Sequence, residues 1–346
     1  MTNIIIRSDE VNAAATALAL SLAGHKVALR GKTLTPGDHS FQYLGHTRTT
    51  SLATIGNFVP TDHTVGVVFA EGESVTDGME YVFRSHTPDL VAIVGGGLTA
   101  VAEAISTASA HNFNTAGILH IGSFIVNGTG TEVRAEKSNV LAGFMGFDTS
   151  PGLIDLATSI FPQISLGDGP TVALSSVNAF VHLPPMLLNA MNVERGVSLK
   201  LYVEGFGDSV CSLLEALDED RIRLGKALGY DLTPVPALME RSRGPNGMPG
   251  KTLREKIHTF PAYQHIRLPS SLNHRYLEHE LRSTFAPMNE VAHALGLQVP
   301  SISSVVRLGE ILLRTDLGTA AKLAARTFIE HLGASSQPDH SQGKVH

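Results

Sequence analysis

Two short segments of the chain carry side chains that can move protons and hold charge. Residues 178–190 read Asn-Ala-Phe-Val-His-Leu-Pro-Pro-Met-Leu-Leu-Asn-Ala, and residues 274–280 read His-Arg-Tyr-Leu-Glu-His-Glu. A histidine titrates near neutral pH, a carboxylate can orient it, and an arginine fork binds a carboxylate through two parallel hydrogen bonds. This combination indicates an enzyme that acts on small carboxylated molecules.

The hydrophobic pattern predicts the elements that must position these side chains. In the first half, short β-branched runs alternate with helical stretches, which predicts an α/β, Rossmann-like, doubly wound parallel sheet. The predicted strands are residues 3–6, 25–29, 65–69, 90–94 and 116–120, and the predicted helices include residues 11–23 and 98–110. In the second half, apolar residues recur at three- and four-residue spacing, so we expect a mainly α-helical domain.

These patterns divide the chain into two domains. We expect a Rossmann-like domain over residues 1–172, a helical catalytic and substrate domain over residues 173–332, and a flexible polar tail over residues 333–346. The Gly- and Pro-containing residues 241–250 predict a surface loop near the substrate entrance. An apolar stripe on residues 301–313 suits a homodimer contact.

Composition narrows the classes of partner. The chain has 346 residues, a net charge of −6 and no dense Lys/Arg run, so nucleic acid and anionic membranes are poor partners. The N-terminus lacks a signal-peptide pattern and no apolar run approaches membrane-spanning length, so we expect a cytoplasmic protein. The single cysteine, Cys211, excludes an internal disulfide, and the sixteen histidines contain no His-Glu-x-x-His pattern. No metal site is predicted.

Three segments, in order along the chain, carry a family resemblance. Asn178-x-x-x-His182, followed by two prolines and then Leu-Leu-Asn-Ala, resembles the catalytic segment of the octopine/opine dehydrogenase family. Residues 206–229 resemble that family's long helix, and residues 274–277 resemble its second catalytic segment. The resemblance implies an enzyme that joins an α-keto acid to the amine of an amino acid and reduces the resulting imine with NADH or NADPH.

The same resemblance assigns roles to individual residues. It implies that His182 is the catalytic acid/base, that Arg275 anchors a substrate carboxylate, and that Glu280, five residues later, is the carboxylate partner of the histidine. The family usually has Asp at the partner position, so Glu280 is one methylene longer. We expect this carboxylate to fix the tautomer of His182 and to raise its pKa. Asn178 lies one helical turn before His182 and is a candidate for binding substrate or nicotinamide.

The first domain departs from the family pattern at two places. Within residues 122–129, Thr129 stands where related enzymes commonly carry an arginine, and Ser123 is the candidate substrate-binding residue. A standard dinucleotide loop needs Gly-x-Gly-x-x-Gly, but residues 7–13 read Arg-Ser-Asp-Glu-Val-Asn-Ala. Asp9 and Glu10 place negative charge where a diphosphate needs positive potential.

Other residues of the first domain favour a nucleotide. Residues 30–32 read Arg-Gly-Lys where an NAD-selective domain would show an acidic residue, which favours NADPH as the cofactor. The run of three glycines at 95–97 follows a predicted strand and would allow close approach of a ligand, or would simply form a turn that needs positive φ. The candidate cofactor-binding residues are Arg7, Ser8, Arg30, Lys32, Gly96 and Gly97.

Three interpretations stay open at this stage. The first is an NADPH-dependent reductase that condenses an amino acid with a keto acid. The second is a cofactor-independent enzyme that uses the pocket of His182, Glu280 and Arg275 on an amino-acid-derived substrate. The third is a non-catalytic binding protein on the same fold, since fold alone does not fix function. A histidine before two prolines and an Arg–Glu pair also occur as purely structural features.

Overall fold

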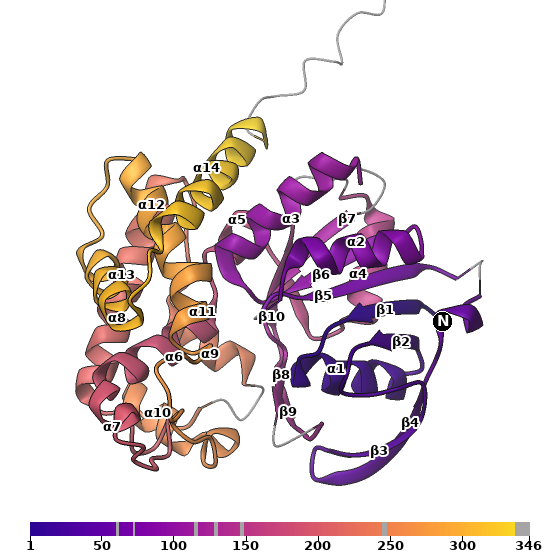
Figure 1. The fold of residues 1–346 in the computed structure, drawn as a ribbon, viewed down its shortest axis with the longest axis horizontal. Helices are drawn as coiled ribbons and strands as arrows, with labels where there is room; N and C mark the ends of the chain where they lie inside the picture. The colour runs from indigo at the N-terminus through magenta and orange to yellow at the C-terminus, as the bar shows by residue number, and fades with distance from the viewer. Residues whose placement is uncertain are drawn as a thin grey trace, which may run out of the picture.

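The computed structural model describes residues 1–59, 62–71, 73–113, 117–127, 131–145, 149–243 and 248–335. In this part of the chain, an N-terminal sheet domain packs beside a C-terminal helical domain (Figure 1). The strands are β1 (Asn3–Arg7), β2 (Lys26–Arg30), β3 (Gly37–Tyr43), β4 (His46–Leu52), β5 (Thr64–Phe69), β6 (Leu90–Val94), β7 (Gly117–Ile121), β8 (Ile125–Asn127), β9 (Val133–Glu136), β10 (Val140–Phe144) and β11 (Ile164–Leu166).

The helices connect the strands of the first domain and make up most of the second. They are α1 (Val11–Leu22), α2 (Val75–Ser85), α3 (Gly97–His111), α4 (Pro151–Ile160), α5 (Gly169–Ala173), α6 (Val177–Leu188), α7 (Ala190–Glu194), α8 (Asp208–Ala227), α9 (Val235–Ser242), α10 (Leu253–Thr259), α11 (Glu278–Glu280), α12 (Ala286–Ala294), α13 (Pro300–Leu313) and α14 (Gly318–Ser335). A π-helix, Leu281–Phe285, joins α11 to α12. Short 3-10 turns lie at Ile55–Asn57 and Pro261–Tyr263.

The main sheet has the order β11-β10-β7-β6-β5-β1-β2. Strands β2, β1, β5, β6 and β7 run parallel, and β10 joins β7 in the antiparallel direction. The strand order reverses between β1 and β5, and ligands of doubly wound sheets bind at the carboxyl ends of the strands beside such a point. The predicted fold class, a Rossmann-like parallel sheet followed by a helical domain, is confirmed.

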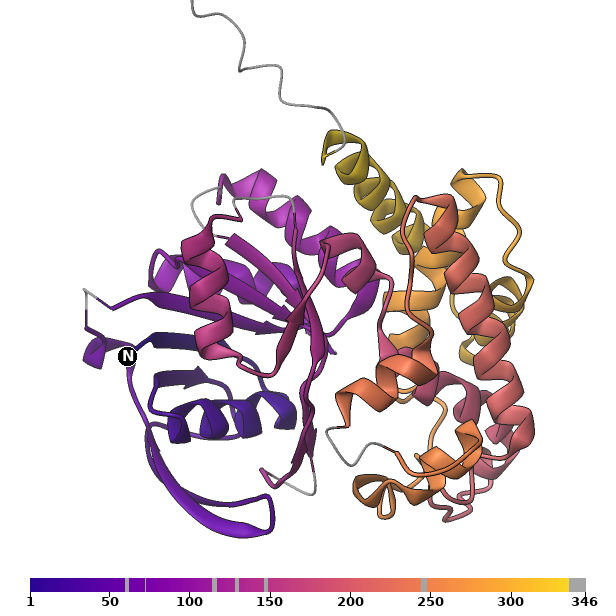
Figure 2. The same ribbon diagram turned by 180° about the vertical axis from the view of Figure 1, so that it is seen from behind.

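The two faces of this sheet are covered by different helices (Figures 1 and 2). Side chains alternate along a strand, so Ile4 and Ile6 pack with α1 and α4 on one face, while Ile5 packs with α2 and α3 on the other. The core on the Ile5 side continues into the helical domain through α6, α8 and α14. This shared core fixes the two domains against each other. The predicted boundary near residue 172 falls within α5 and stays a prediction.

A second, smaller sheet with the order β4-β3-β9-β8 lies beside the first. Its β3–β4 hairpin was not expected, because most of its residues are exposed and polar and carry no clear apolar alternation. Leu44 and Gly45 form its turn with positive φ.

The long helix α8 is held in the core by charged side chains. Arg221 is fully buried, and its guanidinium donates to Asp218, to the hydroxyl of Ser175 and to the carbonyl of Thr233. A buried charge is stable only when it is paired and hydrogen-bonded. The network also ties α8 to Ser175, which lies just before α6, and to Thr233. Asp218 and Arg221, two of the charged residues within residues 206–229, therefore have a structural role.

Two predicted segments differ from the structure. The loop expected over residues 241–250 begins inside α9, which continues to Ser242, and Met248 is buried; the residues between 243 and 248 lie outside the described part. Residues 333–335, expected to be the start of the tail, belong to α14, which continues to Ser335. Residues 336–346 lie outside the described residues.

One apolar stretch in the described residues, Gly169–Leu188, has the length and composition of a membrane span. It comprises α5 and α6, and 72% of its apolar window is buried inside the protein. A core helix of a soluble protein passes the same test, so this stretch is only weak support for a membrane span.

Candidate active site

A cleft of about 430 Å³ lies between the two domains. The first domain contributes the N-terminus of α1 and the β8–β9 region, and the second contributes α6 and the segment before α11. The lining residues are Glu10, Val11, Asn12, Ser123, Ile125, Val126, Arg134, Lys137, Asn178, His182, Tyr202, Tyr263, His265, Ile266, Arg275 and Tyr276. A pocket of this volume is of the size that binds small molecules, and most of its lining side chains are polar or charged.

His182 and Glu280 form a buried pair at the floor of this cleft. The Nδ1 atom of His182 lies 2.6 Å from Oε1 of Glu280, although 98 residues separate the two in the chain. Tyr276 stacks on the imidazole with ring centroids 3.8 Å apart, which fixes the plane of the ring. Because Nδ1 is engaged, Nε2 is the ring nitrogen available to a substrate. The extra methylene of Glu280 is accommodated at hydrogen-bonding distance.

Burial dominates the electrostatics of this pair. Burial lowers the pKa of His182 well below 6.5, and nearby Arg275 lowers it further. Burial also raises the pKa of Glu280 to about 7. The expectation that the carboxylate raises the pKa of His182 is therefore wrong in direction, because loss of water around the imidazole outweighs the attraction of its partner. Because the two groups are hydrogen-bonded to each other, they titrate as a coupled pair.

Arg275 reaches into the same cleft but already has a carboxylate partner. Its Nη1 atom lies 2.7 Å from Oε2 of Glu71, a buried residue that follows β5. Glu71 also accepts hydrogen bonds from the amides of Asn12 and Asn178 at 3.1 and 3.0 Å. The side chain of Arg275 is 31% exposed and lines the cleft, so part of its guanidinium stays accessible.

The charge state of Glu71 follows from these contacts. Burial opposes its ionisation, but the cation of Arg275 and the imidazoles of His279 and His182 outweigh burial and lower its pKa to about 2. Glu71 is therefore a fixed negative charge at the carboxyl end of β5. Arg275 in turn has its pKa raised by Glu71, despite its own burial.

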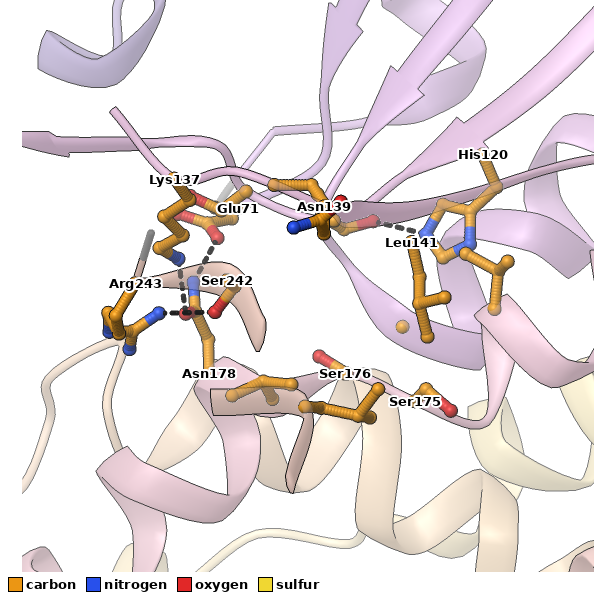
Figure 3. A pocket seen from close by; sticks show the side chains of 18 residues that line it. Glu71, His120, Lys137, Asn139, Leu141, Ser175, Ser176, Asn178, Ser242 and Arg243 are labelled. Carbon is orange, nitrogen blue, oxygen red and sulfur yellow. Dashed lines mark hydrogen bonds between the residues drawn. The ribbon is translucent and has the colours of Figure 1, made fainter. Parts of the chain in front are cut away.

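Lys137 is a further buried cation at this site. It follows β9, is 8% exposed, and its Nζ lies 3.4 Å from Oδ1 of Asn178. Burial, with repulsion from Arg243, lowers the pKa of its amine to about 7. Lys137 lines both the cleft and a smaller neighbouring cavity, called the side pocket here (Figure 3). The side pocket is lined by Glu71, Gly95, Gly97, His120, Gly122, Ser123, Lys137, Asn139, Val140, Leu141, Val172, Ser175, Ser176, Val177, Asn178, Leu238, Ser242 and Arg243.

The candidate cofactor residues gather in a third cavity, of about 330 Å³, at the ends of β1 and β2. It is lined by Arg7, Ser8, Asp9, Arg30, Gly31, Lys32 and Glu73. Of the predicted cofactor-binding residues, the structure thus brings together Arg7, Ser8, Arg30 and Lys32. Three cations in one cavity suit a phosphate group, but two carboxylates lie among them.

The loop between β1 and α1 does not fit a diphosphate held in the usual way. In a dinucleotide-binding loop the backbone N–H groups face the diphosphate. Here the N–H of Asp9 donates to Glu73 at 2.7 Å, and the N–H of Glu10 donates to the hydroxyl of Ser8 at 3.0 Å. The carboxylate of Asp9 in turn accepts the N–H of Lys32 at 2.6 Å. The chain's own side chains therefore occupy donors that a diphosphate would need.

The glycine run 95–97 is a tight turn with positive φ at all three residues. A Cβ at Gly97 would lie 2.4 Å from the hydroxyl of Thr284, and one at Gly96 would lie 2.4 Å from Cβ of Ala70. Close packing therefore requires both glycines, whatever they bind. Gly97 lines the side pocket, while Gly96 is covered by its neighbours.

The remaining candidates have the following positions. Ser123 lines both the cleft and the side pocket, next to Lys137. Thr129 lies outside the described residues. In the described part of the chain, no group of three or more His, Cys, Asp or Glu side chains is placed to hold a metal ion.

Sequence patterns did not single out Glu71 and Lys137. Glu71 lies just after the carboxyl end of the fully buried strand β5, next to the point where the strand order reverses. A carboxylate at such a position is a signal that could have identified it from the sequence. Lys137 lies in a Lys-Ser-Asn turn that is unremarkable in sequence.

Residues 169–313 match the family model described as the alpha-helical domain of NAD/NADP octopine/nopaline dehydrogenase. The chain is 32% identical over 203 residues to an opine dehydrogenase of Arthrobacter sp. (strain 1C), covering 57% of this chain and 54% of that protein. It is 28% identical over 167 residues to protein ocs of Agrobacterium tumefaciens (strain Ach5), covering 48% and 46%. The chain thus spans about half the length of the curated relatives it matches.

Solved structures share the fold across nearly the whole chain. An octopine dehydrogenase with NADH and L-arginine has a TM-score of 0.73 and 12% identity, covering 100% of this chain and 99% of that one. A yersinopine dehydrogenase with NADP+ bound has a TM-score of 0.68 and 14% identity, covering 95% and 99%. At this identity the likeness shows a common fold.

Proposed function

We propose that the protein is an oxidoreductase of the opine dehydrogenase type, because its helical domain matches the octopine/nopaline dehydrogenase family model and the chain is similar to an opine dehydrogenase. Its substrates in this proposal are the amine of an amino acid and an α-keto acid. The observation that carries the proposal is the His182–Glu280 pair, 2.6 Å apart and buried beside Arg275 in a cleft of substrate size. The resemblance to the family was carried by the segment that contains His182 and by the segment around Arg275, from which Glu280 follows.

In this proposal His182 moves the protons of the condensation. The neutral imidazole accepts a proton at Nε2 from the amine as its nitrogen bonds to the keto carbon, and gives that proton to the keto oxygen, which becomes the hydroxyl of the carbinolamine. It then accepts the second proton of the same nitrogen and gives it to this hydroxyl, which leaves as water as the C=N bond forms. The product of these steps is an imine. Glu280 accepts the hydrogen bond from Nδ1 and keeps the ring in the tautomer that leaves Nε2 free.

Arg275 is the proposed anchor for a substrate carboxylate. Its Nη1 is held by Glu71, which fixes the guanidinium plane, and the exposed remainder of the fork faces the cleft. Asn178 bridges Glu71 and Lys137, so it orients the polar wall of the cleft and is a proposed substrate contact. Ser123, at the edge of the cleft, is a second proposed contact.

The proposed cofactor is NADPH, whose nicotinamide would supply the hydride that reduces the imine. Arg30 and Lys32, with Arg7, would face its extra phosphate. Asp9 and Glu73 oppose binding of the diphosphate, as described above. This conflict favours a second candidate function, a cofactor-independent enzyme in which the His182 pair performs condensation or elimination on an amino-acid derivative.

Calorimetric titration of the purified protein with NADPH and with NADH separates these two functions. Micromolar binding of NADPH, followed by NADPH oxidation with a keto acid and an amino acid, supports the reductase. Absence of binding up to millimolar concentration contradicts the reductase and leaves the cofactor-independent enzyme.

The variant His182→Ala is then assayed for both candidate activities. We expect kcat to fall about 10²–10⁴-fold, the usual scale for a positioned proton-transfer group. Substrate binding without turnover in the wild-type protein would indicate a binding protein.

Two further predictions concern the whole protein. We propose a homodimer, because Leu308 and Ile311 on α13 are 42% and 56% exposed and form an uncovered apolar surface. The mass in solution, measured by light scattering at several concentrations, tests this. The cytoplasmic location stays a prediction from the sequence.

A further inference from the structure

The side pocket has more positive than negative charge. Its charged lining residues are Lys137, Arg243 and Glu71, and the carboxylate of Glu71 is held by Arg275. Within the described residues, neither Lys137 nor Arg243 has a carboxylate within ion-pair distance. Lys137 is buried and Arg243 is partly buried. A cation removed from water without a counter-charge is costly, so a site that keeps these two is suited to an anion from outside.

The polar atoms of the side pocket are also incompletely paired. Arg243 donates to Ser242 and to the hydroxyl of Tyr263, but its buried Nε has no partner among the described residues. The Nδ1 atom of His120, a residue 3% exposed, likewise has no partner in the described part of the chain. In Figure 3, Lys137 and Arg243 lie at one end of the pocket and His120 at the other. Buried polar atoms without partners are uncommon in folded proteins, so both ends are suited to a polar ligand group.

The size of the side pocket limits what it can hold. Its cavity volume is about 60 Å³, room for about four or five water molecules and too little for a whole substrate. The cleft beside it, with about 430 Å³, is large enough for one. Ser123, Lys137 and Asn178 line both cavities, so a substrate in the cleft can extend one small group past Lys137.

We propose that the side pocket binds a second carboxylate of the substrate, so that the keto acid is dicarboxylic. The terminal carboxylate would lie between Lys137 and Arg243 and accept hydrogen bonds from the ammonium and guanidinium groups, while Arg275 holds the carboxylate next to the keto carbon. This inference rests on the proposed function, because it names the class of keto acid used at the same site.

Direct binding tests the inference without any need for turnover. We compare 2-oxoglutarate with 2-oxohexanoate, a monocarboxylic keto acid of similar length, by calorimetry on the full-length protein. We expect 2-oxoglutarate to bind at least about tenfold more tightly, the usual scale for a hydrogen bond to a charged group. Lys137→Met and Arg243→Met should each remove this preference, measured as the ratio of the two affinities on the same variant. Lys226→Met, an exposed cation on α8, is the matched control and should keep the preference.

A second measurement uses the wild-type protein alone, in case the buried substitutions prevent folding. Burial keeps the pKa of the Lys137 amine at about 7, and a carboxylate beside it would raise that pKa. Binding of 2-oxoglutarate slightly above neutral pH should therefore take up protons, which is measured as a dependence of the binding enthalpy on the ionisation enthalpy of the buffer. Binding of 2-oxohexanoate should take up fewer.

The outcomes separate this inference from the proposed function. Equal affinity for the two keto acids, or a preference that both Met variants retain, overturns the dicarboxylate subsite. A preference for 2-oxoglutarate that depends on Lys137, in a protein that oxidises no NADPH, supports the subsite and contradicts the proposed reductase. Oxidation of NADPH with equal use of both keto acids supports the proposed reductase and contradicts the dicarboxylate subsite.

Discussion

At the scale of single residues, the site depends on pairs rather than on isolated groups. His182 is useful as a base because Glu280 occupies Nδ1 and Tyr276 covers one face of its ring. Arg275 has a fixed orientation because Glu71 holds one end of its guanidinium. Each functional side chain of the second domain thus has a partner that sets its protonation or direction. Removing the partner should alter chemistry while leaving the functional residue in place.

Glu280→Gln tests this dependence through the pH profile. Burial raises the pKa of Glu280 to about 7, so the His182–Glu280 pair loses its shared proton as pH rises through that value. We expect the wild-type kcat/KM to rise with pH through about 7, because the deprotonated pair is the form that accepts a proton. In Glu280→Gln the amide cannot titrate, so the rise should move below pH 6.5 and the plateau should fall by about 10²–10⁴-fold.

Glu280→Asp is the matched control for this measurement. It keeps a titrating carboxylate and restores the residue usual in the family, so its rise should stay near neutral pH. A rise at the same pH in wild type and Glu280→Gln would assign the titration to another group.

At the scale of elements, the loop between β1 and α1 decides whether a nucleotide binds. Glu73 and Asp9 place two carboxylates beside the N-terminus of α1, where a diphosphate would lie. Neutral isosteres remove both charges and keep the side-chain shape. We expect Asp9→Asn combined with Glu73→Gln to tighten NADPH binding about thirtyfold, since each of the two charges, a few ångströms from a phosphate, costs about 1 kcal/mol at a solvated surface.

Calorimetry at low salt measures this change. Glu219→Gln, an exposed carboxylate on α8, is the control and should leave the affinity unchanged. The gain in the double variant should shrink as salt is added, because exposed charges are screened. An unchanged affinity would mean that the geometry of the loop, and not its charge, opposes the diphosphate.

The sequence predicted those elements whose pattern is set by burial. The central strands were predictable because β1, β5 and β6 are apolar runs covered on both faces. The β3–β4 hairpin was not, since its exposed polar residues leave its pairing to the turn and to β9. The π-helix Leu281–Phe285 also has no sequence signal, although it packs Ser283 and Thr284 against Gly97.

The sequence likewise predicted only part of the site, because burial and the docking of the domains bring its other residues together. His182 and Glu280 were expected to form a pair because both lie in segments that resemble the family, and the structure brings them together. Glu71 and Arg275 lie 204 residues apart in the chain, and only the docking of one domain on the other makes them neighbours. Lys137 became a candidate only when its burial was known, because burial, not residue type, changes the behaviour of its amine.

At the scale of the whole molecule, Glu71 and Arg275 join the two domains through an ion pair that also belongs to the active site. The carboxylate comes from the end of β5 in the sheet domain, and the guanidinium comes from the segment before α11 in the helical domain. In the proposed function, stability and substrate binding are therefore coupled at one contact. A change that weakens the contact should both loosen the domains and alter the substrate anchor.

Glu71→Gln should destabilise the protein in a pH-dependent manner. The pKa of Glu71 is lowered from 4.5 to about 2 in the folded state, so its contribution is present in full above the unfolded-state value and is lost as pH falls toward 2. That shift corresponds to a contribution of up to roughly 3 kcal/mol at neutral pH, since one pKa unit is about 1.4 kcal/mol. Urea unfolding of both proteins at several pH values measures the difference.

The pH dependence separates this ion pair from a mere packing defect. If the carboxylate charge stabilises the interface, the difference in unfolding free energy between wild type and Glu71→Gln should shrink by roughly half by about pH 3. A packing defect would give a constant difference at every pH, and Glu215→Gln, an exposed control on α8, should give almost none. The substitution should also release Nη1 of Arg275 and remove the orientation that Glu71 imposes, so the affinity for 2-oxohexanoate should change together with stability. A variant that loses stability with unchanged affinity would show that Arg275 ties the domains together and does not anchor a carboxylate.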